Sequence, residues 1–225
     1  MEKRSSLSLI YIMILSIIVM AIVEAYIQPG YFIKSLVKIF VFLVVPLIYA
    51  FRKKDFPLVL LFKINSRKEF IRSLVLAFTI YIGIMTAYFI LRSFIDFNNI
   101  QNILADNLNI SKANFIYVAL YISFINSLLE EFFFRGFIFL NLNGTIPRWK
   151  AYAISALGFS VYHIAILSNW FNPFIFILAL TGLFIGGIIF NWLNEKTKNI
   201  YNSWLVHMFA NFAINTVGLM MYNII

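Results

Sequence analysis

Seven long apolar runs separated by short polar stretches dominate the chain. A helix rises about 1.5 Å per residue, so about 20 apolar residues cross the hydrocarbon core of a bilayer. The runs are continuously apolar and do not alternate with polar residues, which excludes a β-barrel. The pattern predicts an all-α polytopic transmembrane helix bundle with spans at 6–27, 36–51, 73–95, 114–142, 151–168, 174–193 and 200–224.

The polar connection at 96–113 is the longest one on its side of the predicted bundle. Its apolar residues Ile100, Ile103, Leu104 and Leu108 have helical spacing. We expect a short amphipathic helix that lies on the surface or caps the bundle. If an eighth helical element exists, this segment is where we expect it.

Two glycines mark a candidate helix contact in the sixth predicted span. Gly182 and Gly186 are four residues apart and therefore share one helix face. Small residues at this spacing allow a neighbouring helix to approach closely. We expect this face to pack against another span.

The composition supports an integral membrane protein. Hydrophobic residues make up 62% of the 225 residues and charged residues only 12%, whereas a soluble domain carries roughly 25% charged residues. No linker-like tract divides the chain, so we expect one membrane-embedded domain over 1–225. The chain has no cysteine, which excludes disulfides, thiol nucleophiles and metal sites with cysteine ligands.

The formal charge of +9 does not point to nucleic acid, because the basic residues are unevenly placed. Cytoplasmic loops of membrane proteins collect Lys and Arg. With the N-terminus in the cytoplasm and the C-terminus outside, the outer side collects only Lys34, Lys38, Arg92 and Lys112. The cytoplasmic side then collects Lys3, Arg4, Arg52, Lys53, Lys54, Lys63, Arg67, Lys68, Arg72, Arg148, Lys150, Lys196 and Lys198.

Several ionisable residues nevertheless fall within predicted spans. Glu130, Glu131 and Arg135 lie in the fourth span, and the only two histidines, His163 and His207, lie in later ones. Ionisable groups at this depth are costly unless they pair or line a wet cavity, so they indicate a functional site. The chain lacks a GxSxG serine elbow, an HExxH motif and any aspartate within a span, which disfavours serine and aspartyl mechanisms.

The two glutamates are expected to have different partners. Residues four apart share a helix face, so Glu131 and Arg135 can form an ion pair. Glu130 points about 100° away and has no partner on its own helix. A carboxyl group without a partner in an apolar environment can act as a general base or acid.

The last predicted span carries a second polar pair. His207 and Asn211 are four residues apart and can together donate hydrogen bonds to a developing oxyanion. In the fifth span, Phe159 precedes His163 by one turn and is expected to fix the direction of the imidazole.

These residues resemble the motifs of a known family. Glu130–Arg135 fits EExxxR, Phe159–His163 fits FxxxH, and His207–Asn211 fits HxxxN. The ordered set resembles the CAAX protease and bacteriocin-processing (CPBP, Abi) family of intramembrane proteases, the superfamily of the Ras and a-factor converting enzyme. The resemblance covers about 114–215, which we take as the catalytic core.

The resemblance implies an intramembrane endopeptidase in which Glu130 and His163 activate water while His207 and Asn211 stabilise the oxyanion. Glu131, Arg135 and Phe159 would support these residues. The family has been labelled metalloprotease, yet the resemblance fits a glutamate mechanism without a cofactor at least as well. We favour the metal-free mechanism, because the candidate ligands are spread over three helices and lack HExxH spacing. If zinc is used, Glu130, His163 and His207 are the candidate ligands.

Other classes of function remain open at this point. The polar residues could form a structural network, a proton-coupled transport path, or a non-catalytic scaffold or immunity protein that binds a peptide. The favoured partners are the lipid bilayer and a membrane-associated or exported peptide substrate, without nucleic acid. Abundant Ile, Asn, Lys and Phe are typical of AT-rich genomes and favour a bacterial plasma membrane.

Overall fold

The computed structural model describes residues 3–52, 61–62 and 66–225. In this part of the chain every regular element is helical, and no β-strand occurs. Seven helical segments are long and apolar enough to cross a membrane, which confirms the all-α polytopic bundle. They are Ser6–Ile27, Tyr31–Arg52, Arg67–Phe94, Phe115–Leu142, Arg148–Leu167, Pro173–Thr197 and Tyr201–Met221.

Several spans change helix type along their length. The first span consists of α1 (Lys3–Ile22) and η1 (Val23–Ile27), and the second of α2 (Tyr31–Ile39), η2 (Phe40–Val44) and α3 (Val45–Arg52). The third consists of α4 (Arg67–Leu91) and η4 (Arg92–Phe94). The fourth consists of α6 (Phe115–Tyr121), η5 (Ile122–Asn126), α7 (Ser127–Glu130), η6 (Glu131–Phe139) and α8 (Leu140–Leu142). The remaining elements are α5 (Phe97–Leu108), α9 (Arg148–Tyr162), α10 (Ile164–Leu167), α11 (Pro173–Thr197) and α12 (Tyr201–Met221). The segments η1, η2, η5 and η6 are π-helical, and π-helical turns often occur at functional sites.

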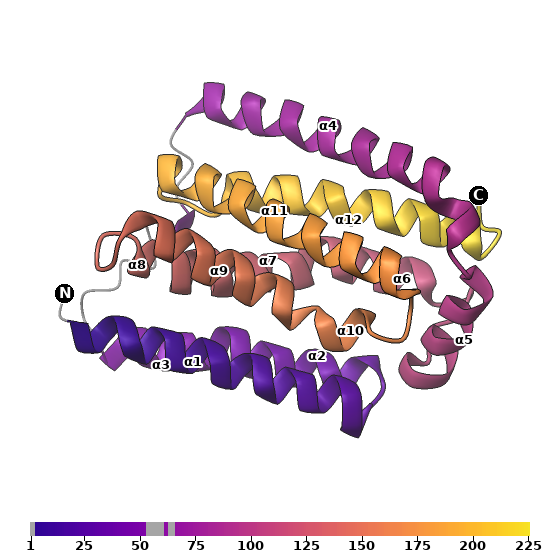
Figure 1. Ribbon diagram of the computed structural model, residues 1–225, viewed down its shortest axis with the longest axis horizontal. Coiled ribbons are helices and arrows are strands. Elements are labelled where there is room, and N and C mark those ends of the chain that lie inside the picture. Colours follow the sequence, from indigo (N-terminus) through magenta and orange to yellow (C-terminus); the bar gives the residue numbers. More distant parts are fainter. Residues whose placement is uncertain (1–2, 53–60, 63–65) are drawn as a thin grey trace.

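The spans run roughly side by side, with the two termini at opposite ends of the bundle (Figure 1). An odd number of crossings requires this separation. The helix α4 lies at one edge and packs on α12, whereas α1 and α2 form the opposite edge.

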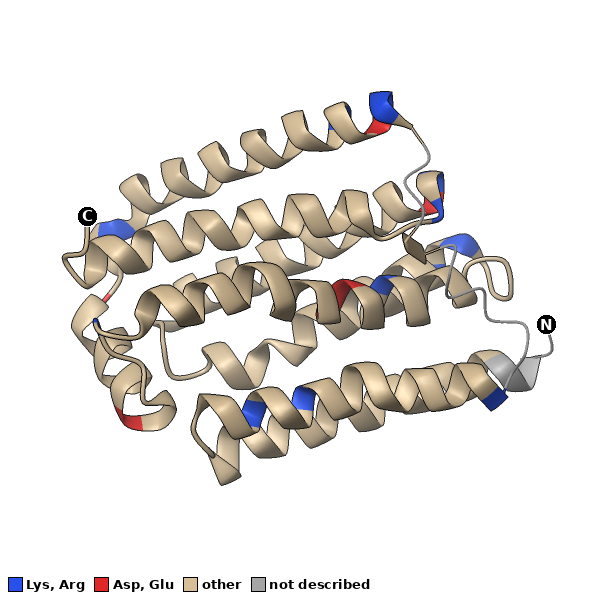
Figure 2. Ribbon diagram, turned by 180° about the vertical axis from the view of Figure 1, so that it is seen from behind, with Lys and Arg blue, Asp and Glu red and all other residues tan. Residues whose placement is uncertain are grey.

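Charged residues gather at the two ends of the bundle, with a smaller group inside it (Figure 2). This distribution agrees with seven crossings, while the cytoplasmic placement of the N-terminus stays a prediction. The predicted cytoplasmic residues Lys53, Lys54 and Lys63 lie outside the described residues, and nothing is described of the side chains of Lys3 and Arg4.

The fourth span forms the centre of the core. Every residue of η6 is buried, including the charged Glu131 and Arg135. Phe133 stacks on Phe42 of η2, with ring centroids 4.3 Å apart, and Phe134 meets Phe159 of α9 edge to face at 5.5 Å. The core therefore fixes η6, and with it the two glutamates at its start, against both η2 and α9.

The polar connection contains the expected amphipathic helix, α5. Asp96 caps its first turn by accepting a hydrogen bond from the Asn99 backbone N–H at 3.0 Å. Ile100 and Leu104 are buried beside Phe115 at the start of α6. The helix thus covers one end of the bundle, as Figure 1 also shows.

Two expectations about individual residues are wrong. Lys34 does not precede the second span, predicted at 36–51, because the span begins at Tyr31 and Lys34 is buried within it, as Lys38 is. The close helix approach does not involve Gly182 or Gly186, since a Cβ atom at either would meet nothing within 4 Å.

The close approach uses the neighbouring glycine instead. A Cβ atom on Gly187 would lie 2.9 Å from the Cα atom of Ala156 in α9. The rotation of α11 about its axis turns Gly187 towards α9 and leaves Gly182 exposed. Small-residue spacing predicts a face, but only packing decides which face is used.

Candidate functional site

Glu130 lies at the end of α7, where the fourth span changes from α- to π-helix. Its side chain is 2% exposed. One oxygen, Oε1, accepts hydrogen bonds from Lys38 Nζ and, at 3.0 Å, from the Asn126 amide. The other oxygen, Oε2, points towards both histidines. The carboxyl group therefore has one anchored oxygen and one that faces the centre of the site.

The two imidazoles approach this free oxygen from different helices. The Nε2 atom of His207, from α12, lies 3.6 Å from Glu130 Oε2, and the Nε2 atom of His163 lies 4.0 Å from it. His163 sits at the break between α9 and α10, which was not foreseen in the continuous fifth span. The structure thus brings together three candidate residues from three spans.

Both imidazoles turn the same nitrogen towards Glu130. His163 Nδ1 lies 2.8 Å from the backbone carbonyl oxygen of Phe159, and His207 Nδ1 lies 2.9 Å from Glu131 Oε1. A carbonyl or carboxylate oxygen can only accept, so Nδ1 must carry the proton in each ring. In the neutral rings, Nε2 is then a lone-pair acceptor.

Three acceptors therefore converge on one place. Two Nε2 lone pairs and a carboxylate oxygen, 3.6 and 4.0 Å apart, are too far apart for direct hydrogen bonds. They repel one another unless a donor stands between them. A water molecule has two O–H groups and fits such a gap, since it can lie about 2.8 Å from each partner.

Glu131 and Arg135 form the ion pair that their spacing predicts. Arg135 Nη1 lies 3.1 Å from Glu131 Oε1, and both side chains are fully buried. The guanidinium carbon also lies 4.1 Å from the Phe159 ring centroid and 4.8 Å from that of Phe190. Because Glu131 also accepts from His207, the pair connects the aromatic core to the imidazole.

Phe159 contacts His163 as expected. The rings of Phe159 and His163 meet edge to face, with centroids 4.8 Å apart. The same phenylalanine supplies the carbonyl that fixes Nδ1 and stacks on the guanidinium of Arg135. One residue therefore orients a histidine and packs against the supporting cation.

Asn211 is held close to the fourth span but is not shown in contact with Glu130. Its Nδ2 donates to the Ile122 carbonyl oxygen at 3.2 Å. One turn further along α12, Asn215 Nδ2 donates to the Ala119 carbonyl oxygen and to the Ser123 hydroxyl. The acceptors are two backbone carbonyl groups and the Ser123 hydroxyl, at the π-helical segment η5 and the end of α6. One N–H of Asn211 is thereby committed, and the second is not used by that bond.

Lys38 is, with Asn126, a residue of the candidate site that the sequence analysis missed. Its ammonium group bonds to Glu130 and Asn126 and lies 4.9 Å from the ring centroid of Tyr162 and 5.5 Å from that of Phe42. The available signal was Lys34 and Lys38, four apart at the start of an apolar run, with glutamates in two other spans. Lys34 pairs in the same way with Glu24 of η1.

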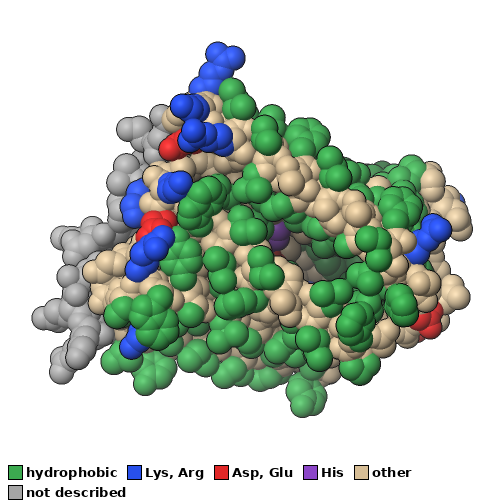
Figure 3. Space-filling view, turned by 45° about the horizontal axis from the view of Figure 1, so that its top comes forward, with side chains coloured by type: hydrophobic (Ala, Val, Ile, Leu, Met, Phe, Trp, Pro, Cys, Tyr) green, Lys and Arg blue, Asp and Glu red, His purple; other side chains and the backbone are tan. Residues whose placement is uncertain are grey.

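A hollow in the lipid-facing surface leads to this group. Histidine side-chain atoms are visible at its bottom, and its rim is mostly hydrophobic (Figure 3). Since His163 and His207 are the only histidines, the hollow reaches the candidate site.

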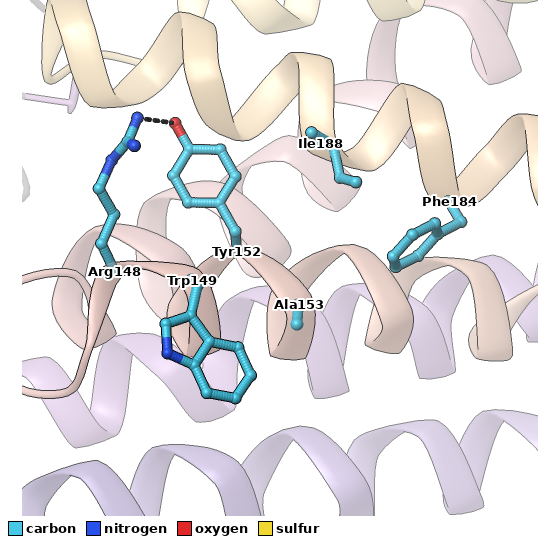
Figure 4. A pocket seen from close by; sticks show the side chains of 6 residues that line it. All are labelled: Arg148, Trp149, Tyr152, Ala153, Phe184 and Ile188. Atoms are coloured by element: carbon cyan, nitrogen blue, oxygen red, sulfur yellow. Dashed lines mark hydrogen bonds between the residues drawn. The ribbon is translucent and has the colours of Figure 1, made fainter.

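A separate groove of about 480 Å³ lies between α9 and α11. Trp149, Tyr152, Phe184 and Ile188 form most of its apolar wall, and Arg148 stands at one end (Figure 4). None of the candidate catalytic residues lines it. The groove is therefore distinct from the histidine-containing hollow.

A search for metal ligands gives no positive result. Among residues 3–52, 61–62 and 66–225, no group of three His, Cys, Asp or Glu side chains is arranged to hold a metal ion. Glu130 also has an ammonium group on Oε1, and a like charge beside a ligand disfavours a divalent cation. The Lys38 ammonium group is thus an observation against the zinc site that was considered, and a chelator tests that site directly.

Comparisons with known proteins agree with the motifs. The model of a family described as type II CAAX prenyl endopeptidase, Rce1-like, matches residues 112–213. All three motifs lie within this segment. Searches of curated proteins and of solved structures find no match. The resemblance expected from the motifs is confirmed as a match to the Rce1-like model over residues 112–213.

Proposed function

We propose that the protein is an intramembrane endopeptidase in which Glu130 and His163 activate a water molecule. The family match supports a CAAX-type protease without indicating its catalytic mechanism. The observation that carries the finer proposal is the convergence of Glu130 Oε2 with the Nε2 atoms of His163 and His207. Glu130 Oε2 and His163 Nε2 are the proposed acceptors of the two water protons, and His207 faces the same point.

In the proposed reaction the water oxygen attacks the carbonyl carbon of the scissile peptide bond. The water proton moves to Glu130 Oε2, and the carbonyl oxygen becomes an oxyanion. The C–N bond then breaks, and the proton on Glu130 passes to the leaving amine. The products are a carboxylic acid, which keeps the second water proton, and an amine, and Glu130 returns to its ionised form.

His207 and Asn211 are the proposed donors to the oxyanion. Because Nδ1 of His207 already donates to Glu131, Nε2 can donate only when the ring is an imidazolium. Glu131 is positioned as its counter-ion. The uncommitted N–H of Asn211 would supply the second hydrogen bond. One preorganised donor of this kind is worth about 10²–10³ in kcat.

The mechanism we propose uses no metal. Its water is activated by a carboxylate whose other oxygen is bound by Lys38 and Asn126. A chelator is therefore expected to leave cleavage unchanged. Cleavage in the presence of a chelator therefore tests the proposed glutamate mechanism without zinc.

The substrate is proposed to be a peptide or protein segment associated with the membrane. The hydrophobic rim of the hollow in Figure 3 supports entry from the bilayer. An exported or lipid-anchored peptide would meet this requirement. A bacterial plasma membrane as the location also stays a prediction.

Purified protein in liposomes, incubated with a library of membrane peptides, tests the proposal. Cleavage products should appear with and without chelator and should be absent with His163→Ala. Loss of cleavage on chelation would contradict the metal-free mechanism. If folded wild-type protein cleaves no peptide but retains one, the non-catalytic peptide-binding alternative replaces the proposal.

A further inference from the structure

The second span contributes a cation to the candidate site, although it lies far outside the family match at 112–213. Lys38 is 5% exposed and sits between α2 and the fourth span. A buried ammonium ion is costly unless it is paired and fully hydrogen-bonded. Its contacts therefore indicate what it does.

The surroundings of Lys38 are built for an ammonium group. Glu130 Oε1 and Asn126 Oδ1 accept two of its N–H bonds. The faces of Tyr162 and Phe42 stand 4.9 and 5.5 Å away and attract a cation through their π electrons. Asn126 also donates to Glu130 Oε1 at 3.0 Å, so the lysine and the amide hold the same oxygen.

The charges within the site balance only when Lys38 is counted. Glu130 and Glu131 supply two negative charges, and Arg135 supplies one positive charge within the matched segment. Without Lys38, the fourth span would hold one uncompensated carboxylate inside the bundle. Such a group takes up a proton to become neutral.

We propose that Lys38 is a positioning residue that keeps Glu130 ionised and fixes Oε1, so that Oε2 faces the two histidines. This inference rests on the proposed function, in which Glu130 must be an unprotonated base. It deepens that function by assigning an essential group to the α1–α2 part of the chain. The protonation state of Glu130, however, can be measured without any substrate.

Lys34 and Glu24 provide a matched control. They form an ion pair one helical turn away, within the same part of the bundle. Lys34 and Lys38 are four residues apart on α2 and face the same side. Removing the Lys34–Glu24 pair tests the effect of losing a buried pair near the site without touching Glu130.

Infrared spectroscopy at neutral pH provides the test that is independent of activity. The Lys38→Met variant should gain the C=O stretch of a protonated carboxylic acid, and the band should disappear when Glu130→Gln is added. The control Lys34→Met/Glu24→Gln should gain no such band. A folded Lys38→Met variant without a new acid band would overturn the proposal.

The absence of native cysteine allows chemical rescue of the ammonium group. Lys38→Cys should lose at least about 100-fold in kcat, the usual contribution of a general base. Alkylation with bromoethylamine, verified as complete by mass spectrometry, recreates a lysine-like ammonium and should restore most of the activity. Iodoacetamide, which adds a neutral amide, should not. Equal activity after both treatments would contradict the role of the charge.

These outcomes separate two failures. If wild-type protein cleaves nothing, the proposed function fails, while the infrared result still decides whether Lys38 keeps Glu130 ionised. If cleavage is confirmed but Lys38→Cys retains full activity, the protease proposal stands and the positioning role of Lys38 is refuted.

Discussion

Arg135→Met should strongly destabilise the protein, because it leaves the Glu131 carboxylate buried without its cation. Both side chains are fully buried, and their charged atoms are 3.1 Å apart. At an effective dielectric constant of about 20, two unit charges at this distance interact by about 5 kcal/mol. Breaking one partner of a buried pair costs about 3–5 kcal/mol.

This energy corresponds to a fall of about 6–20 °C in Tm, since about 1 kcal/mol shifts Tm by about 2–4 °C at this chain length. Tryptophan fluorescence during heating in detergent measures it. Adding Glu131→Gln to Arg135→Met should recover most of the loss, because both charges are then removed. Methionine keeps part of the packing that the guanidinium makes with Phe159 and Phe190.

The control is Arg148→Met, which removes an ion pair with Glu195 in which the arginine side chain is 66% exposed. Exposed pairs contribute little to stability, so its Tm should fall much less. If Arg135→Met and Arg148→Met melt alike, or if Glu131→Gln gives no recovery, the reasoning from burial is refuted.

Two further predictions concern packing and the oxyanion site. Gly187→Ala should lower Tm by about 2–12 °C, because its Cβ would lie 2.9 Å from the Ala156 Cα and overpacking costs about 1–3 kcal/mol. The control Gly182→Ala should not lower Tm, because its Cβ would meet nothing within 4 Å. Equal falls in Tm for the two variants would refute the assigned contact. Asn211→Leu should reduce kcat about 100-fold or more with little change in KM, as expected for a donor used in the transition state. Both constants are measured with the same cleaved peptide. An effect on KM alone would remove Asn211 from the oxyanion site and leave its bond to Ile122 as a structural contact.

The number and approximate bounds of the spans could be predicted because continuous apolar runs leave little choice in a bilayer. The i, i+4 pair Glu131–Arg135 followed from helix geometry alone. The start of the second span did not, because hydropathy treats Lys34 and Lys38 as costs. Their partners, Glu24 and Glu130, lie in other spans, and only the folded bundle shows that the costs are offset.

The catalytic assignment shows a similar limit. Spacing and motifs brought Glu130, His163 and His207 forward as candidates, and the structure places them around one point. The sequence analysis gave Glu130 no partner on its own helix, but Asn126 donates to it from one turn earlier, and Lys38 pairs with it from the second span. Which imidazole nitrogen faces Glu130 depends on the Phe159 carbonyl and on Glu131, and the rotation of these groups is set by packing.

Single-turnover cleavage of one membrane peptide by Glu130→Gln and Glu24→Gln, with chelator present, tests the central claim most directly. Glu130 has a buried side chain and Glu24 a mostly buried one that is 9% exposed, and both pair with lysines of α2, so Glu24→Gln is a matched control. Glu130→Gln should slow cleavage by about 10²–10⁴-fold with the protein still folded, and Glu24→Gln should cleave at close to the wild-type rate. Equal rates for the two variants, or cleavage by Glu130→Gln at the wild-type rate, would contradict a glutamate-activated water.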